Sequence, residues 1–228
     1  MDRREFTGQL SAGISLWVWA AQARALSLSD ADASAGLKAA LERGAEVAVG
    51  LLGKTDGFLG NPKVRIPLPS GLESAAKLMK SLGQGKKVDE LVTAMNRAAE
   101  AAVPESKQLL SNAVKQMSVD DAKKILTGGD TSVTNFFAEK TRAPLGEKFL
   151  PIVTKQTEKV DLAEKYNAVA GKASGFGLVK KEDANVQKYV TGKALDGLYL
   201  MIGEEEKKIR QDPVGTGSAI LKKVFGAL

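Results

Sequence analysis

The stretch NVQKYVTGKALDGLYLMIGEEEKKIR, residues 185–210, decides the fold of this 228-residue chain. Apolar side chains recur along it at every fourth position, which indicates one face of a helix. The residues of this face are Val186, Val190, Ala194, Leu198 and Ile202. Other apolar residues fill most of the remaining circumference, and a helix that is apolar nearly all round belongs inside a domain. We therefore predict a long central helix that stops before Asp212 and Pro213.

The segments that precede this helix repeat a simpler pattern, in which amphipathic helical stretches alternate with short breaks rich in Gly, Pro and capping residues. Pro144 and Pro151 are expected to interrupt the helical pattern of residues 143–160. The apolar fraction of 43% is enough for one sizeable core. The fold class that we predict is all-α, a single multi-helix domain of residues 26–228 packed around the central C-terminal helix.

One segment breaks the helical pattern clearly. Residues 53–69, GKTDGFLGNPKVRIPLP, contain three glycines and three prolines, which exclude a helix. A residue that precedes proline is restricted to extended geometry. Residues 64–68 are therefore predicted to form one short extended strap or edge strand.

The composition excludes several classes of chemistry, because the chain contains no Cys and no His. Ser-His-Asp and Cys-His catalysis, thiol redox chemistry and zinc sites that need Cys or His are excluded. We predict no catalytic residue, no metal site and no cofactor, although carboxylate, Lys, Tyr and Ser chemistry stays open. The net charge of +6 is mild and scattered, without a basic run interleaved with aromatic residues, so no nucleic-acid partner is expected.

The first 25 residues have the features of a cleavable export signal peptide. Arg3 and Arg4 form a charged region, and residues 10–21, LSAGISLWVWAA, form a short apolar core. The sequence Ala-Arg-Ala that follows, ending at Ala25, is a small-x-small cleavage pattern. A core of this length is too short to cross a bilayer, which needs about 20 apolar residues.

The route of export is open between two alternatives. Arg3, Arg4 and Phe6 resemble part of a twin-arginine signal, but Asp2 stands where Ser or Thr is usual, so the general secretory route is equally compatible. No other stretch is apolar enough to span a membrane, so no transmembrane segment is expected in the mature chain. We predict a periplasmic location if the source is a bacterium with two membranes.

Arg65 and Asp196 are the first candidate binding residues. Asp196 is the one charged residue in the most apolar part of the central helix, where an unpaired carboxylate is costly. Arg65 lies in the strap between apolar neighbours, and a guanidinium binds a carboxylate in a bidentate manner. We predict that the two form a pair, either a structural clasp between strap and helix or a recognition pair.

Gly215, Gly217 and Ser218 form the second candidate. They precede an apolar helical pattern, and backbone N–H groups at a helix start can hold an anion. The segment lacks the length and the lysine of a P-loop, so an ordinary turn with an N-cap is the alternative.

Two further patterns have structural interpretations. Residues 204–206 are three consecutive glutamates, which point about 100° apart on a helix and are expected on a solvated face rather than in a metal site. The aromatic residues Phe136, Phe137, Tyr189 and Tyr199 are expected in the core, with the lining of an apolar ligand cavity as the alternative.

Four strings resemble a known bacterial family, the domain of unknown function 4197. They are NPKVRIPLP at 61–69, ILTGGDTSVTNFF at 125–137, KALDGLYLMIGEEEKKIRQDP at 193–213 and ILKKVFG at 220–226. The resemblance covers essentially the whole mature chain. It implies an exported, largely helical protein, and it supplies no activity, substrate or catalytic residue.

The function that we expect is that of an exported, non-catalytic binding or interaction protein of the cell envelope. Its partner is expected to be an envelope protein or an apolar ligand. Two alternatives stay open, a carboxylate-dependent hydrolase of an envelope polymer and a structural envelope component. The hydrolase needs two acidic side chains about 5–10 Å apart in a cleft.

Overall fold

The computed structural model describes residues 30–129 and 131–212. This part of the chain is helical and contains no β-strand, which confirms the predicted all-α class. The α-helices are α1 (Asp30–Leu52), α2 (Glu73–Met79), α3 (Gly85–Ala102), α4 (Lys107–Lys115), α5 (Val119–Thr127), α6 (Ser132–Thr157), α7 (Asp161–Gly175) and α8 (Val186–Gln211). The short 3₁₀ or π turns are η1 (Ser70–Leu72), η2 (Lys80–Gln84), η3 (Val103–Ser106) and η4 (Lys181–Asp183).

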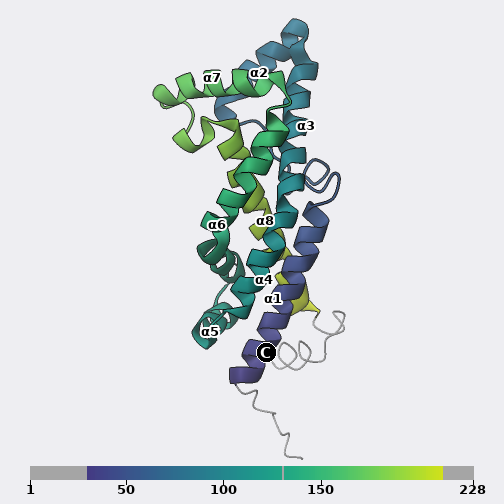
Figure 1. Ribbon diagram of the computed structural model, residues 1–228, viewed down its shortest axis with the longest axis vertical. Helices are drawn as coiled ribbons and strands as arrows, with labels where there is room; N and C mark the ends of the chain where they lie inside the picture. The colour runs from purple at the N-terminus through teal and green to yellow at the C-terminus, as the bar shows by residue number, and fades with distance from the viewer. Residues whose placement is uncertain (1–29, 130, 213–228) are drawn as a thin grey trace, which may run out of the picture.

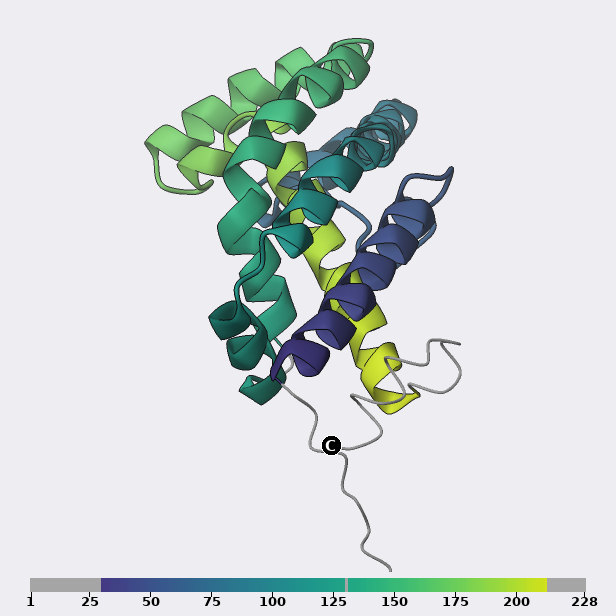
Figure 2. The ribbon, with the colours of Figure 1, turned by 60° about the horizontal axis from the view of Figure 1, so that its bottom comes forward.

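The predicted central helix is α8. It packs against α6, α1 and α3, and Figures 1 and 2 show it running between these helices along much of the molecule. Its apolar face is fully buried, with Val190, Ala194, Leu198 and Ile202 each 0% exposed. The side chain of Asn185 caps its first turn by accepting a hydrogen bond from the N–H of Lys188 at 2.9 Å. One sequence segment thus provides a surface on which three other helices pack.

The expected interruption at Pro144 and Pro151 does not occur, because both prolines lie inside the 26-residue helix α6. The buried face of α6 explains its continuity. Buried side chains recur at every fourth position through both prolines: Phe137, Thr141, Leu145, Phe149, Val153 and Thr157. This face packs on α8 and α3, and burial of so many side chains outweighs the two helical hydrogen bonds that the prolines remove.

The predicted strap is present as residues 65–69, which are extended and form no strand pairing. It crosses between α3 and α8. Asn96 of α3, 0% exposed, fixes its position, because its amide accepts from the N–H of Ile66 at 2.8 Å and donates to the C=O of the same residue at 2.9 Å. Tyr189 of α8 donates its phenol hydrogen to the C=O of Pro67 at 2.9 Å. Two side chains from opposite helices therefore bind the strap through its backbone.

The loop that leads into the strap is held by a buried carboxylate. Glu100 of α3 accepts hydrogen bonds from the backbone N–H groups of Phe58 and Leu59, at 3.0 and 3.1 Å, and from Arg97 at 2.7 Å. Arg97 also pairs with Asp56 at 2.8 Å, and Asp56 has a left-handed backbone with φ of 63°. These bonds satisfy a charge that is only 4% exposed, so they hold the loop against α3.

Candidate functional site

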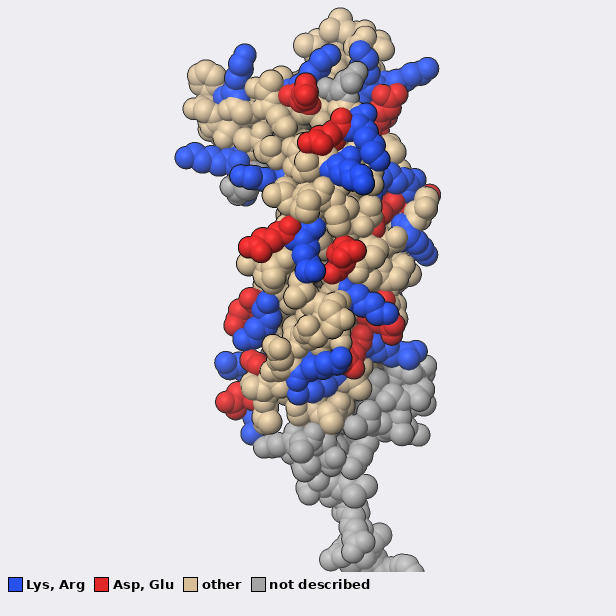
Figure 3. Space-filling view, in the orientation of Figure 1, with Lys and Arg blue, Asp and Glu red and all other residues tan. Residues whose placement is uncertain are grey.

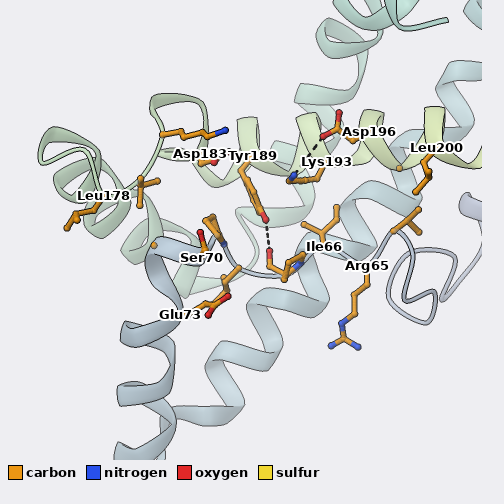
Figure 4. Close-up of a pocket in the computed structure, with 18 of the residues that line it drawn as sticks. Arg65, Ile66, Ser70, Glu73, Leu178, Asp183, Tyr189, Lys193, Asp196 and Leu200 are labelled. Carbon is orange, nitrogen blue, oxygen red and sulfur yellow. Dashed lines mark hydrogen bonds and ion pairs between the residues drawn. The ribbon is translucent and has the colours of Figure 1, made fainter. Parts of the chain in front are cut away.

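A polar cleft of about 690 Å³ lies over the strap. Its walls are the strap itself, the start of α2, the loop after α7 and one face of α8, as Figure 4 shows. Basic and acidic side chains both line it: Lys63, Arg65, Lys180 and Lys193 against Glu73, Asp183 and Asp196. The mixture of charges leaves the cleft without a strong preference for one sign of ligand.

Arg65 and Asp196 both line this cleft, but the predicted pair between them is not formed. Arg65 points away from Asp196, and its guanidinium lies 3.4 Å from the C=O of Leu59 (Figure 4). Asp196 is paired instead with Arg142 of α6, at 2.7 Å. The prediction also placed Asp196 in the core, whereas half of its side chain is exposed. The reason is that its turn of α8 faces the cleft, so the carboxylate is never desolvated.

Arg142 has a second contact with α8. Its guanidinium carbon lies 5.3 Å from the centre of the Tyr199 ring, a distance that suits a cation–π interaction. The Tyr199 hydroxyl, in turn, lies 3.0 Å from the hydroxyl of Thr141 on α6. The clasp that Asp196 was expected to form with the strap is thus a clasp between α6 and α8.

Tyr189 forms the inner wall of the cleft. Burial, together with the nearby negative charge of Asp183, raises the pKa of Tyr189 to about 12. The phenol is therefore protonated at neutral pH and serves as a hydrogen-bond donor to the strap. Lys193 lies over its ring, with 6.0 Å from the ammonium nitrogen to the ring centre. The role that the geometry assigns to Tyr189 is structural support of the cleft.

The other predicted residues have different outcomes. Gly215, Gly217 and Ser218 lie outside the described residues. The glutamates expected on a solvated face are mostly buried, since Glu205 and Glu206 are 9% and 4% exposed. Helix α1 covers this face of α8, where a Cβ at Gly44 would lie 3.7 Å from the Cβ of Glu205.

A second hollow lies between α2, α3 and α7 and has a volume of about 350 Å³. We call it the apolar groove. Its lining is Leu68, Leu72, Ala75, Ala76, Met79, Val88, Leu91, Leu162, Lys165, Tyr166, Ala168 and Val169. Ligand sites in proteins are concave and mostly apolar, and this volume lies at the lower end of their usual range of about 300–1,000 Å³. Leu68 of the strap lines both hollows, so the strap separates them.

Two residues of the apolar groove carry polar side-chain atoms. The phenol of Tyr166 donates to the C=O of Asp183 at 2.8 Å, and burial raises the pKa of this tyrosine. Lys165 is exposed at the surface of α7. The polar end of Tyr166 is therefore already bonded, and the one charge available to a ligand is a cation at the rim.

Neither hollow has the composition of a metal site. Groups of three or more carboxylates placed to hold a metal ion do not occur within residues 30–129 and 131–212. Within the same ranges, no helix has both the length and the apolar character needed to cross a bilayer.

The sequence contained a signal for the backbone contacts of the strap that periodicity alone did not reveal. Asn96, which holds the strap, and Glu100, which holds the loop before it, are four positions apart on one face of α3, beside the buried Met95 and Ala99. A pair of polar residues bordering an apolar stripe was the available sign of a buried backbone contact.

Comparison with known families shows the family of this chain. A family model described as a protein of unknown function (DUF4197) matches residues 27–226. The chain belongs to this family. The match confirms the resemblance noted from the four sequence strings. For this DUF4197 member, neither a curated protein nor a solved structure gives a significant match.

Proposed function

We propose that this DUF4197 protein is an exported, non-catalytic binding protein of the cell envelope. We further propose that its apolar groove takes the aliphatic chain of an anionic amphiphile, such as a fatty acid. The observation that carries this proposal is the groove itself, which is concave, nearly free of polar groups and bordered by one cation. The leader, residues 1–25, supports export.

The lining of the groove favours an aliphatic chain over a polar ligand. A polar ligand needs hydrogen-bond partners in the hollow, because burial of a polar group without such a partner costs binding free energy. The phenol of Tyr166 is already bonded to Asp183, so the interior offers dispersion and apolar burial alone. Lys165 at the rim suits a carboxylate or phosphate head group that stays near water.

The carboxylate-dependent hydrolase gains less support. Of the acidic residues in the polar cleft, Asp196 is ion-paired with Arg142 and half exposed. A general acid of that mechanism usually lies in an apolar environment that raises its pKa. Asp196 does not lie in an apolar environment, because half of its side chain is exposed.

Native mass spectrometry of the protein isolated gently from the envelope fraction of its own host tests both parts of the proposal. We expect an intact mass that begins at Leu26 and an additional mass that is released on unfolding. A mature protein without bound ligand argues against tight ligand carriage, and an uncleaved chain argues against export through a removed signal.

Substitutions in α2 locate the ligand. Ala76→Phe fills the apolar groove and is expected to weaken binding of a fluorescent fatty-acid analogue by about tenfold or more. Ser74→Phe adds the same bulk to the exposed side of α2, outside the groove, and is the matched control. Lys165→Glu is expected to weaken binding of the ionised acid but not of the corresponding alcohol. Equal losses in Ala76→Phe and Ser74→Phe contradict the assignment.

A further inference from the structure

The most exposed large apolar side chains of the described residues gather at one end of the molecule. They are Phe176 at 83%, Leu178 at 69%, Leu82 at 68% and Leu78 at 61% exposed. They lie in two segments, residues 77–87 and residues 165–181, which we call together the crest. Figure 1 places α2 and α7 at the upper end, away from the start of α1.

The crest also concentrates positive charge, although the sequence had indicated a scattered excess. It contains eight lysines and no acidic residue: Lys77, Lys80, Lys86, Lys87, Lys165, Lys172, Lys180 and Lys181. All eight are exposed. Without them, the chain's other 25 basic residues are outnumbered by its 27 acidic residues. The net positive charge of the protein therefore comes from the crest.

The lysines of the crest are largely free to meet an external anion. Within the described part of the chain, Lys80 is the one crest lysine that forms an ion pair, with Asp89 at 2.9 Å. Acidic neighbours exist in the sequence at Asp89, Glu90, Glu164 and Glu182, on the borders of the crest. Figure 3 shows blue side chains projecting around an uncharged surface at the upper end, with some red side chains beside them.

The fold makes little use of one half of the crest. Neither α2 nor η2 contains a buried residue. At Gly83, inside η2, the backbone is left-handed with φ of 76°, and there the chain turns from α2 into α3. The neighbouring Leu82 is left at the outside of this turn. Leu82 therefore adds little to the core, and it contributes with Leu78, Phe176 and Leu178 to the exposed apolar surface of the crest.

We propose that the crest docks peripherally on the surface of a bilayer that contains anionic phospholipid. Exposed apolar side chains interleaved with lysines are the composition of segments that lie in a membrane interface. The apolar side chains enter the acyl boundary, and the lysines stay at the level of the phosphates. A single exposed aromatic residue, Phe176, provides little surface for base stacking, so nucleic acid fits this surface less well. The inference does not require a ligand in the apolar groove.

Vesicle flotation tests the docking. The protein is the chain from Leu26 onward, which contains every described residue. The vesicles are phosphatidylcholine alone and phosphatidylcholine mixed with phosphatidylglycerol. We expect binding to the mixed vesicles that weakens with salt, and much weaker binding to the neutral ones. Equal binding to both vesicles overturns the proposed role of the lysines.

Variants separate the two components of the crest. Lys77→Glu with Lys172→Glu is expected to weaken binding to the mixed vesicles by at least about 25-fold, since each lysine near an anionic surface contributes about fivefold. Leu82→Ser with Phe176→Ser is expected to weaken it by at least about tenfold. Val119→Ser with Lys124→Glu makes similar changes in α5, at the lower end of Figure 1, and is the control. A loss in this control as large as in the crest variants contradicts a localised docking surface.

Three further outcomes overturn the inference. First, the free protein sediments as a dimer, and the variant Leu82→Ser with Phe176→Ser dissociates it; the crest is then an interface between two copies of the chain. Tight binding of an oligonucleotide that depends on the lysines but not on Leu82 and Phe176 assigns it to nucleic acid. If Ala76→Phe abolishes vesicle binding, the apolar groove rather than the crest holds the lipid. If Ala76→Phe abolishes fatty-acid binding alone, the bilayer inference stands independently.

Discussion

Phe149 and Phe176 are the same side chain in opposite surroundings. Phe149 lies in the middle of α6 and is 0% exposed, whereas Phe176 follows the end of α7 and is 83% exposed. Around Phe149, buried side chains at every fourth position of α6 face α8 and α3. Phe176 lies in the turn that follows α7, where little of the described chain covers it. The comparison shows that the apolar character of a side chain can be read from the sequence, whereas its burial depends on which other elements of the fold pack against it.

The same contrast separates the body of the molecule from the crest. In the body, the buried faces of α1, α3, α6 and α8 pack on one another, and most of the ion pairs lie at the surface. In the crest, exposed apolar side chains and mostly unpaired lysines share one surface. A protein that exposes apolar side chains in this way has either a partner or a tendency to aggregate.

Replacing each phenylalanine by alanine tests this difference in burial most directly. Phe149→Ala leaves a cavity in the core and is expected to cost about 3–5 kcal/mol of unfolding free energy. Phe176→Ala is expected to change that free energy by less than about 0.5 kcal/mol. Urea titration of both variants measures the difference. A large loss in Phe176→Ala contradicts the exposed position of this side chain in solution.

Two glycines of α8, Gly197 and Gly192, allow a packed and an unpacked position to be compared within a single helix. A Cβ at Gly197 would lie 2.8 Å from Cε1 of Phe58 and 3.2 Å from Cβ of Val64, in the loop that packs on α8. Gly197→Ala is therefore expected to destabilise the fold by about 1–3 kcal/mol.

At Gly192 no atom beyond the neighbouring residues and backbone of α8 lies within 4 Å of such a Cβ, so the same substitution tests helix propensity alone. Gly192→Ala is expected to stabilise the protein by about 0.5–1 kcal/mol. Thermal unfolding of the pair should give shifts of opposite sign. Shifts of the same sign argue against tight packing of the loop on α8.

The smallest effect is expected at the surface of the body. The pair of Arg142 with Asp196 is half exposed, so a double-mutant cycle should give a coupling of about 0.2–1 kcal/mol that falls with salt. Arg65 and Asp196 should show no coupling in the parallel cycle. A coupling to Arg65 larger than that to Arg142 restores the pairing that the sequence suggested.

The central helix and the strap were predictable because their signals are local. The fourth-residue repeat from Val186 to Ile202 needs no knowledge of neighbours, and the prolines at positions 67 and 69 restrict the backbone whatever surrounds them. The continuity of α6 through Pro144 and Pro151 was not predictable in this way. It depends on α8 and α3 covering one face of α6, which only the folded chain provides.

The candidate site was harder to predict for the same reason. Asp196 was correctly placed on α8, but its partner depends on which helix lies across from it, and Arg142 is 54 positions away. The apolar groove depends on a gap between α2 and α7 rather than on any motif. A sequence pattern identifies apolar faces, and it does not indicate which of them the fold leaves uncovered.

The amide of Asn96 has a consequence for how the protein can change over evolutionary time. It recognises main-chain atoms of Ile66, and Tyr189 recognises a main-chain oxygen of Pro67, so neither bond depends on the side chains that the strap presents. The strap residues that face the polar cleft are therefore open to substitution while the strap keeps its course. Homologous chains can line this cleft with different chemistry on one conserved scaffold, and position 96 should tolerate exchange far less than position 65.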